Sequence, residues 1–359
     1  MRESHFWHYA AVRLLSFLFT YVVLVYAFCA LLDSQLVTQV EQTLYWDVSQ
    51  VAQRMLSSGE ISQEEYKGVL QEIYKQARHE RGFDLPVLVR IHHRATRILR
   101  FDFGRSAEGI GVLYRPNVPV LSVIGEFATP TAMLFTGAFV VQMLLGVLLG
   151  AWNANRPGSF LDRATTFLAT ATMSIPPAVA AMFAVLLFVF AIPIAPSTPF
   201  VFHPPSDGVG LVAWIGSLFS HLALPFVTVV LLTVWATAHT VRNLNLGVLQ
   251  EDFVTSARAR GIPERRVLYG HGLRASAPPI VTVAVLGLFA SLWGSFLVEP
   301  IFQWRGIGML FLAAIRTNDI TMLLALLVTV TGASQLAQVV LDLTYGWLDP
   351  RVKVGRPKL

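Results

Sequence analysis

The chain alternates long apolar runs with polar segments, and six of the runs are about 20 residues or longer, the length that an α-helix needs to cross a bilayer. They lack the alternation of apolar and polar residues that membrane β-strands show, and they run well past the ten or so residues of such a strand. The pattern therefore predicts an all-α polytopic membrane protein with six transmembrane helices. The runs lie near residues 12–32, 128–152, 165–192, 211–238, 277–298 and 321–345.

Composition supports a lipid environment. Of the 359 residues, 54% are hydrophobic and only 14% are charged, and the mean hydropathy is +0.58. These values are typical of a membrane protein and exclude two or three ordinary soluble domains. The formal net charge of +5 is explained by membrane topology, so lipid is an expected partner and nucleic acid is not.

The distribution of Lys and Arg predicts the orientation, because short cytoplasmic segments are enriched in these residues. The connection at 193–210 holds none, and the one at 300–320 holds only Arg305 and Arg316. Both termini are therefore predicted to be cytoplasmic. The inner segments hold Arg2, Arg13, Arg156, Arg163, six arginines from Arg242 to Arg274, Arg351, Lys353, Arg356 and Lys358.

The first apolar run is predicted to remain as a helix. It is longer than the apolar region of a signal peptide and lacks a small-residue cleavage site at its end, and Cys29, the only cysteine, lies inside it. The predicted organisation has four parts: 1–32 (N-terminus and first helix), 33–125 (extracytoplasmic loop domain), 126–346 (permease core, with a cytoplasmic loop at 242–275) and 347–359 (cytoplasmic tail).

The segment 61–82 in the outer loop carries strong helix signals. Ser62 and Glu65 have the spacing of a capping box, Ile61 and Tyr66 that of a hydrophobic staple, and Gly82 is expected to end the helix. Its apolar residues share one face. That face either packs on the membrane domain or is a docking surface for an external partner.

Four of the six arginines from Arg242 to Arg274 lie in a segment that we call the elbow, residues 251–271: they are Arg258, Arg260, Arg265 and Arg266. Residues 251–260 suit a short helix that ends at Gly261, where a left-handed backbone is expected. Pro263 then begins a second helix, with Glu264 at the positive end of its dipole. A basic loop that only fixes topology would need fewer residues, so the elbow is predicted to fit a groove of a cytoplasmic partner.

Several residues inside the apolar runs have two possible roles. Pro176 and Pro177 are expected to kink the third helix, as a gate hinge or as a static feature of packing. GVLLG at 146–150 is a close-packing motif. Gly287 and Gly294, seven residues apart, could bring the fifth helix against a partner subunit.

The strongest rival is an ion-coupled secondary transporter, which would need ionisable residues near the membrane centre. The central parts of the six runs contain no Asp, Glu, Lys or Arg. His221 lies toward the outer end of the fourth run, and Asp342 is expected to pair with a basic residue at the cytoplasmic interface.

An intramembrane enzyme is disfavoured because the sequence has no His-Glu-x-x-His or Gly-x-Ser-x-Gly motif. His92 and His93 are interpreted as solvated surface. A receptor domain at 33–125 would need only one anchoring helix.

The residues from about 80 to 355 resemble the permease subunits of ABC transporters, specifically the B-type subunits of the peptide importers. The run ARARGIPERRVLYGHGLRASAPPIVT at 257–282 is similar to the cytoplasmic EAA loop of that family. The other matching motifs, in order, are FDFGRS at 101–106, MSIPPAV at 173–179, VEPIFQWRGIG at 298–308 and LDLTYGWLDPRVK at 341–353.

The resemblance implies the fold of a type I importer permease in a prokaryotic inner membrane. The implied partners are a second permease in a heterodimer, two cytoplasmic ATPases and an extracytoplasmic solute-binding protein. The sequence contains no Gly-x4-Gly-Lys-Ser/Thr loop for a nucleotide, so the chain is expected to be a transport subunit without catalytic, metal-binding or cofactor-binding residues. ATP and Mg²⁺ would bind to the ATPases.

By position, the resemblance assigns the elbow to the coupling of transport with ATP hydrolysis. The chain departs from the family pattern at LLDSQLVTQV (31–40), at Thr255 and at Arg305. Peptides, metal chelates and sugars remain open as solutes, in that order. The coupling residues are Phe253, Ala257, Arg258, Ala259, Gly261, Glu264 and Arg265, and the gate or hinge residues are Pro176, Pro177, Gly287 and Gly294.

Overall fold

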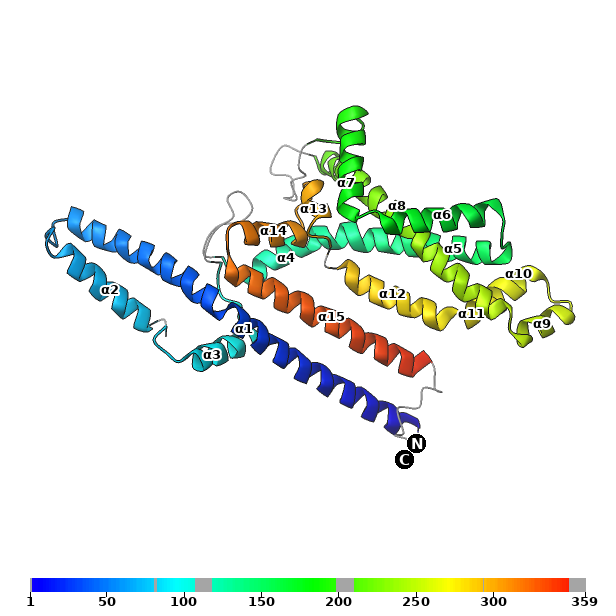
Figure 1. The fold of residues 1–359 in the computed structure, drawn as a ribbon, viewed down its shortest axis with the longest axis horizontal. Helices are drawn as coiled ribbons and strands as arrows, with labels where there is room; N and C mark the ends of the chain where they lie inside the picture. Colours follow the sequence, from blue (N-terminus) through cyan, green and yellow to red (C-terminus); the bar gives the residue numbers. More distant parts are fainter. Residues whose placement is uncertain (1, 81–82, 107–117, 198–209, 293, 349–359) are drawn as a thin grey trace. The chain divides into compact units, whose positions relative to one another are not determined.

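The computed structural model describes residues 2–80, 83–106, 118–197, 210–292 and 294–348. Within these ranges the regular elements are helices (Figure 1). Four of them are long and apolar enough to cross a membrane, and the number rises to six if two bent pairs each count as one span. The four are Trp7–Ser57, Val120–Asn155, Leu211–Leu249 and Ile320–Leu343; the pairs are Phe160–Ser174 with Pro177–Ala191 and Glu264–Ala275 with Ala277–Ser291.

The chain forms two compact units. One contains Met1–Leu14, Glu126–Leu310 and Ala333–Leu359, and the other contains Leu15–Gly125 and Phe311–Gly332. We call them the core unit and the N-terminal unit. The helices α1 (Arg2–Ser57), α4 (Val120–Thr131), α14 (Ile307–Arg316) and α15 (Ile320–Leu348) contribute residues to both.

The core unit is organised around α5 (Gly137–Asn155) and α8 (Leu211–Leu249), which pack side by side (Figure 1). The GVLLG motif faces α8, because a Cβ at Gly146 would lie 2.6 Å from Thr237 Cγ2 and one at Gly150 would lie 2.5 Å from the Ala238 carbonyl oxygen. Real Cβ atoms do not come this close, so the two glycines set the distance between the helices. The predicted packing role of the motif is confirmed.

The third apolar run is broken. Helix α6 (Phe160–Ser174) and helix α7 (Pro177–Val185), which continues as the π-helix η2 (Leu186–Ala191), meet at an angle of 97°. Pro176 precedes α7 and Pro177 is its first residue, a position where the missing N–H costs little. The predicted kink is therefore present, as a complete break between two helices.

The N-terminal unit shows that helix α1 continues 25 residues beyond the predicted end of the first span at residue 32. Residues 33–57 of the predicted outer loop are thus helical. Helix α2 (Tyr66–Glu80) returns along α1, with Arg78 Nη2 3.1 Å from Glu41 Oε1. The predicted capping box precedes α2, since Ser62 N donates to Glu65 Oε2 at 2.9 Å and Glu65 N donates to Ser62 Oγ at 3.3 Å. Gly82, its predicted end, lies outside the described residues.

Helix α3 (Val87–Leu99) is fastened to α1 by the buried Asp33. The Asp33 carboxylate accepts from Arg90 Nη2 at 2.7 Å and from Arg94 Nη1 at 2.8 Å. Three further residues of α3, Ile91, Ala95 and Ile98, join residues of α1 and α15 in one apolar cluster. The remaining described helices are η1 (Ala132–Thr136), α9 (Asp252–Ala259), α10 (Glu264–Arg266), η3 (Val267–Gly272), α11 (Leu273–Ala275), α12 (Ala277–Ser291) and α13 (Val298–Ile301).

Candidate functional site: the elbow between α8 and α12

The elbow consists of α9, a sharp corner, α10 and η3 as far as His271, and α11 follows it directly. These short elements lie together beyond the ends of α5 and α8 (Figure 1). The predicted helix at 251–260 is observed as α9, and the predicted second helix begins at Glu264, directly after Pro263. The local sequence signals therefore placed both elements correctly.

The corner is a Schellman motif, in which a left-handed residue ends a helix and two backbone bonds close it. Gly261 has a φ of +73°. Its N–H donates to the Arg258 carbonyl oxygen at 2.9 Å, and the N–H of Ile262 donates to the Ala257 carbonyl oxygen at 3.3 Å. Within the described part of the chain, no atom approaches within 4 Å of a Cβ placed at Gly261. The requirement for glycine there is thus one of backbone conformation.

One face of the elbow is buried against the transmembrane helices. Val254, Ala257, Val267 and Leu268 are each at most 1% exposed, and they pack with Ala154 of α5 and Leu249 of α8. Fully burying a Val or Leu side chain stabilises a fold by about 1.5–3 kcal/mol, so these contacts hold the elbow firmly on both helices. A displacement of the elbow would therefore move α5 and α8 with it.

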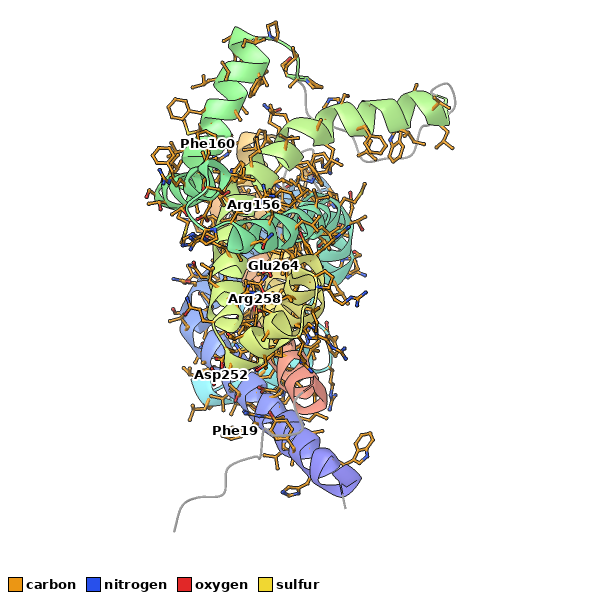
Figure 2. The ribbon with its side chains drawn as sticks, turned by 90° about the vertical axis from the view of Figure 1, so that its right-hand side faces the viewer. Phe19, Arg156, Phe160, Asp252, Arg258 and Glu264 are labelled. Atoms are coloured by element: carbon orange, nitrogen blue, oxygen red, sulfur yellow. The ribbon has the colours of Figure 1, made fainter. Side chains whose placement is uncertain are left out.

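The opposite face is exposed and carries an aromatic ring and several charges. Phe253 is 46% exposed and Tyr269 is 38% exposed. Arg258 and Glu264 form a two-pronged ion pair across the corner, with Nη2–Oε1 at 2.7 Å and Nε–Oε2 at 3.2 Å (Figure 2). An exposed pair contributes at most about 1 kcal/mol, so its main effect is to orient the two side chains.

The structure separates the predicted coupling residues into two groups. Ala257 is buried and supports the corner from inside. The others are exposed on the elbow: Phe253, Arg258, Ala259, Gly261, Glu264 and Arg265. Sequence reasoning missed Tyr269, which adds a second aromatic ring to the exposed face.

The predicted hinge glycines do not share a helix face. Gly287 lies in α12, where a Cβ would overlap the ring of Phe139 of α5. Helix α12 ends at Ser291, and Gly294 lies beyond it with a φ of +62°. A Cβ at Gly294 would overlap Glu299 Oε1. Both glycines therefore allow close contacts inside the core unit, and the spacing of seven residues has no helical meaning.

A buried ion pair joins α6 to α8. Arg242 Nη2 lies 2.8 Å from Asp162 Oδ2, and Asp162 is 3% exposed. The same carboxylate accepts from the N–H of Gly158 at 2.8 Å, while Ser159 caps α6 by accepting from Asp162 N at 3.3 Å. Sequence analysis explained Arg242 only by membrane topology, whereas the structure shows that it also forms an ion pair with Asp162.

Glu299 was missed by sequence reasoning although it is a charged residue in an apolar stretch with Gly294, Gly306 and Gly308 nearby. It is fully buried, and its carboxylate accepts from Thr131 Oγ1 at 3.0 Å, Gly308 N at 2.7 Å and Met309 N at 3.2 Å. Burial raises the pKa of Glu299 to about 7, an effect that the hydrogen-bond donors oppose. The segment 298–308 is therefore folded around one carboxyl group.

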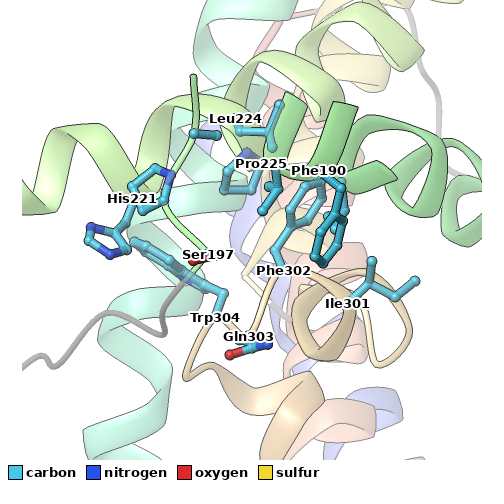
Figure 3. Close-up of a pocket in the computed structure, with 13 residues that line it drawn as sticks. Phe190, Ser197, His221, Leu224, Pro225, Ile301, Phe302, Gln303 and Trp304 are labelled. Atoms are coloured by element: carbon cyan, nitrogen blue, oxygen red, sulfur yellow. The ribbon is translucent and has the colours of Figure 1, made fainter. Parts of the chain in front are cut away.

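A small cavity of about 60 Å³ lies between η2, α8 and α13. His221, Pro225, Gln303 and Trp304 line it (Figure 3). His221 Nδ1 is 2.7 Å from the Ser217 carbonyl oxygen. The described residues contain no group of three or more His, Cys, Asp or Glu that could hold a metal ion.

Asp342, the other titratable residue considered for a proton relay, is paired. Its Oδ2 lies 3.2 Å from Arg13 Nε, which confirms the expected pairing with a basic residue. This contact disfavours a proton-carrying role for Asp342.

Comparison with known proteins gives a consistent result. Residues 142–354 match the family described as "Binding-protein-dependent transport system inner membrane component". The chain is 32% identical to the oligopeptide transport system permease protein OppB of Mycobacterium tuberculosis over 283 residues, which cover 77% of this chain and 84% of the relative. It is 28% identical to the probable D,D-dipeptide transport system permease protein DdpB of Escherichia coli, with 79% and 85% covered. For the oligopeptide transport system permease protein AppB of Bacillus subtilis, the values are 28%, 76% and 82%.

Proposed function

The chain belongs to the family of inner-membrane components of binding-protein-dependent transport systems, and from this premise we propose that it forms half of a translocation pathway for short peptides or similar small solutes. Permease subunits of this ABC family have no ATPase site of their own. The proposal of a peptide as the solute draws on the names of the relatives, which describe oligopeptide and dipeptide transport systems.

The observation that carries the proposal is the two-faced elbow. Its inner face packs on α5 and α8, and its outer face presents Phe253, Tyr269, Arg258 and Glu264. Because its inner face is packed on α5 and α8, a partner that binds the outer face and moves it would also move these two helices. The elbow is therefore the proposed contact with a cytoplasmic ATPase, whose bound ATP and Mg²⁺ supply the energy.

The remaining parts of the proposal follow from the charge distribution and the breaks in the helices. Both termini and the elbow are cytoplasmic, residues 33–125 form an extracytoplasmic domain, 126–346 form the permease core and 347–359 a cytoplasmic tail. The chain pairs with a second, different permease, two ATPases and an extracytoplasmic solute-binding protein. The break at Pro176 and Pro177 acts as a hinge of the gate, and Gly287 and Gly294 allow close packing elsewhere in the core unit.

Single-cysteine chains test the proposal directly. Cys29 is the only cysteine and is buried, so Cys29→Ala gives a cysteine-free background. We expect Arg265→Cys in the elbow to cross-link to a polypeptide with a Walker motif, and the matched exposed control Glu72→Cys in α2 to give no such product. A membrane-impermeant maleimide should label position 72 and leave position 265 unlabelled in intact cells.

Two results would count against the proposal. Labelling of position 265 from outside would reverse the orientation. Purification of a chain that moves solute without ATP, with no ATPase cross-linked at position 265, would favour an ion-coupled secondary transporter.

A further inference from the structure

The N-terminal unit contains a cavity of about 500 Å³, which we call the arginine cavity. It is bounded by α1, α3, the loop at 102–105 and the first turns of α15. All of these segments belong to one compact unit. The volume lies in the range of about 300–1,000 Å³ that is usual for small-molecule sites.

Four side-chain contacts fix the walls of the arginine cavity to one another. Arg94 of α3 binds Asp33 of α1 at 2.8 Å, and Arg97 Nε binds Asp102 of the loop at 2.8 Å. The other two contacts involve α15: Ser106 Oγ donates to Asp319 Oδ2 at 2.7 Å, and Ile320 N donates to Gln39 Oε1 at 3.0 Å. The walls of the open cavity are thus joined to one another in a connected frame.

The loop itself is tightly built. Phe101 and Gly104 have φ values of 61° and 79°, and the N–H of Gly104 donates to Asp102 Oδ1 at 3.0 Å. A side chain that bonds to the backbone two residues on is typical of an Asx turn. This turn holds Asp102 where it can orient Arg97 beside the cavity.

The lining combines cationic and apolar groups. Arg94, Arg97 and Arg105 line it together with two carboxylates, those of Glu80 and Asp102. Arg94 and Arg97 each give one N–H group to the carboxylates described above, and each guanidinium has five such donors. The apolar part of the lining is formed by Leu36, Val40, Phe83, Ile98, Phe103, Leu324 and Ala325. A ligand that suits both parts is an anion with a hydrocarbon portion.

The position of the arginine cavity along α1 indicates the source of such a ligand. Leu36 and Val40 follow the end of the first apolar run at residue 32 by four and eight residues, or about 6 and 12 Å at the helical rise. Phospholipid headgroups occupy a layer of roughly 5–8 Å outside the hydrocarbon core. Thr321 and Leu324 also lie at the start of the last apolar run. The Leu36 side of the cavity is thus level with the headgroups, and Val40 lies just beyond them.

We propose that the arginine cavity binds the phosphate group of an anionic phospholipid, with the guanidinium groups of Arg97 and Arg105 on the phosphate and the apolar wall against the start of its acyl chain. The planar guanidinium suits phosphate oxygens in particular. Assignment to the outer leaflet rests on the proposed orientation of the chain, whereas the binding of phosphate does not. A bound lipid would tie α1, α3 and α15 together beside the membrane.

The test measures the lipid that the full chain retains. The purified chain is reconstituted into vesicles of phosphatidylcholine with or without phosphatidylglycerol, extracted again in mild detergent and analysed by lipid mass spectrometry. We expect wild-type chain to retain phosphatidylglycerol in preference to phosphatidylcholine. Loss of one charge-assisted hydrogen bond weakens binding by about tenfold or more, so Arg97→Gln with Arg105→Gln should abolish the preference.

A second variant guards against a loss of fold. Thr321→Trp keeps every arginine and fills the cavity from α15, and it should also lose the bound phosphatidylglycerol. Arg78→Gln is the matched control, because Arg78 belongs to the same unit and pairs with Glu41 outside the cavity. It should retain lipid as the wild type does.

The proposal is overturned if both cavity variants retain phosphatidylglycerol like the wild type, or if the wild-type chain retains phosphatidylcholine and phosphatidylglycerol equally well. The assay needs no ATPase. If the chain retains the lipid but its elbow cross-links to no ATPase, the proposed function is contradicted and the lipid proposal is not.

Discussion

The N–H of Ile262 donates to the carbonyl oxygen of Ala257 at 3.3 Å, and this bond folds the chain back at the end of α9. Both residues also belong to the apolar cluster that joins the elbow to α5 and α8. The corner is thus fixed by its backbone and by its packing. Any change that opens the corner should loosen the exposed face above it.

The first prediction concerns Gly261, whose left-handed backbone is strained for most residues. We expect Gly261→Val to cost about 1–3 kcal/mol locally and to abolish ATP-driven uptake, while the amount of chain in the membrane stays normal. Gly261→Asn should retain most activity, because asparagine tolerates this conformation best after glycine. Uptake into membrane vesicles measures the effect.

Gly59 offers a matched control for this prediction. It has a φ of +79° and, like Gly261, meets no described atom within 4 Å of a Cβ, but it lies in the turn between α1 and α2. Gly59→Val should leave ATP-driven uptake intact. Equal loss of uptake in both valine variants would show that backbone strain alone, and not the elbow, matters.

The second prediction concerns the ion pair of Asp162 and Arg242. Removing one partner of a buried pair leaves an uncompensated charge and typically costs about 3–5 kcal/mol. We therefore expect Asp162→Ala to lower the thermal unfolding temperature in detergent markedly. The double variant Asp162→Leu with Arg242→Met should recover most of the loss, because two apolar side chains replace the pair. A double variant less stable than Asp162→Ala would contradict this account.

The third prediction is a pH dependence that originates at Glu299. Because the pKa of Glu299 in the folded chain is raised to about 7, the folded state binds more protons than the unfolded state between its ordinary pKa and pH 7. Stability should therefore fall as the pH rises through this interval. Thermal unfolding across the interval measures the trend.

The variant Glu299→Gln should flatten this profile, because its amide resembles the neutral carboxyl group. Thr131 can serve either form of Glu299. Its hydroxyl donates to Glu299 Oε1 at 3.0 Å or to the Phe127 carbonyl oxygen at 3.2 Å, and in the second case it can accept a hydrogen bond from the neutral carboxyl group. Glu299→Ala should be far less stable, since buried N–H groups that lose their acceptor cost about 1–3 kcal/mol each. A pH profile unchanged by Glu299→Gln would refute the assignment.

The fourth prediction compares two helical glycines of the core unit. Gly150→Ala should destabilise the chain, because the new methyl group would lie 2.5 Å from the Ala238 carbonyl oxygen and would push α5 away from α8. Gly247→Ala places a methyl group in α8 where no described neighbour lies within 4 Å. It should be neutral or stabilising by up to about 1 kcal/mol, because alanine favours helix. The thermal unfolding temperature should thus fall for Gly150→Ala, and it should stay unchanged or rise for Gly247→Ala.

Features encoded by neighbouring residues could be predicted from the sequence. The capping box of Ser62 and Glu65, the corner at Gly261 and the close approach at Gly146 and Gly150 depend on spacings of three or four residues, or on the backbone of one residue. The apolar runs also gave the positions of the helices that could span the membrane, because hydrophobic length is a local property.

Features that depend on distant residues could not be predicted. Nothing near Asp33 shows that α1 continues through it, since its charge is balanced by Arg90 and Arg94, some 60 residues later in the sequence. Glu299 likewise looks exposed in the sequence, and only its contact with Thr131, 168 residues away, explains its burial. Gly294 was assigned to the fifth helix because its spacing fitted, but a left-handed backbone cannot be recognised from spacing.

Because α1 is unbroken, the direction in which the side chains of its C-terminal half point depends on the number of residues before them. Asp33 and Glu41 bind Arg94 and Arg78, so two attachments eight residues apart must keep one rotational phase. Inserting a single residue between them would turn Glu41 by about 100° relative to Asp33 and detach α2 from one of its anchors. Inserting seven residues would restore the angle to within about 20° while raising α2 by about 10 Å. Each residue of α1 therefore sets both a distance along the helix axis and a rotation about it, and an insertion or deletion changes the two together.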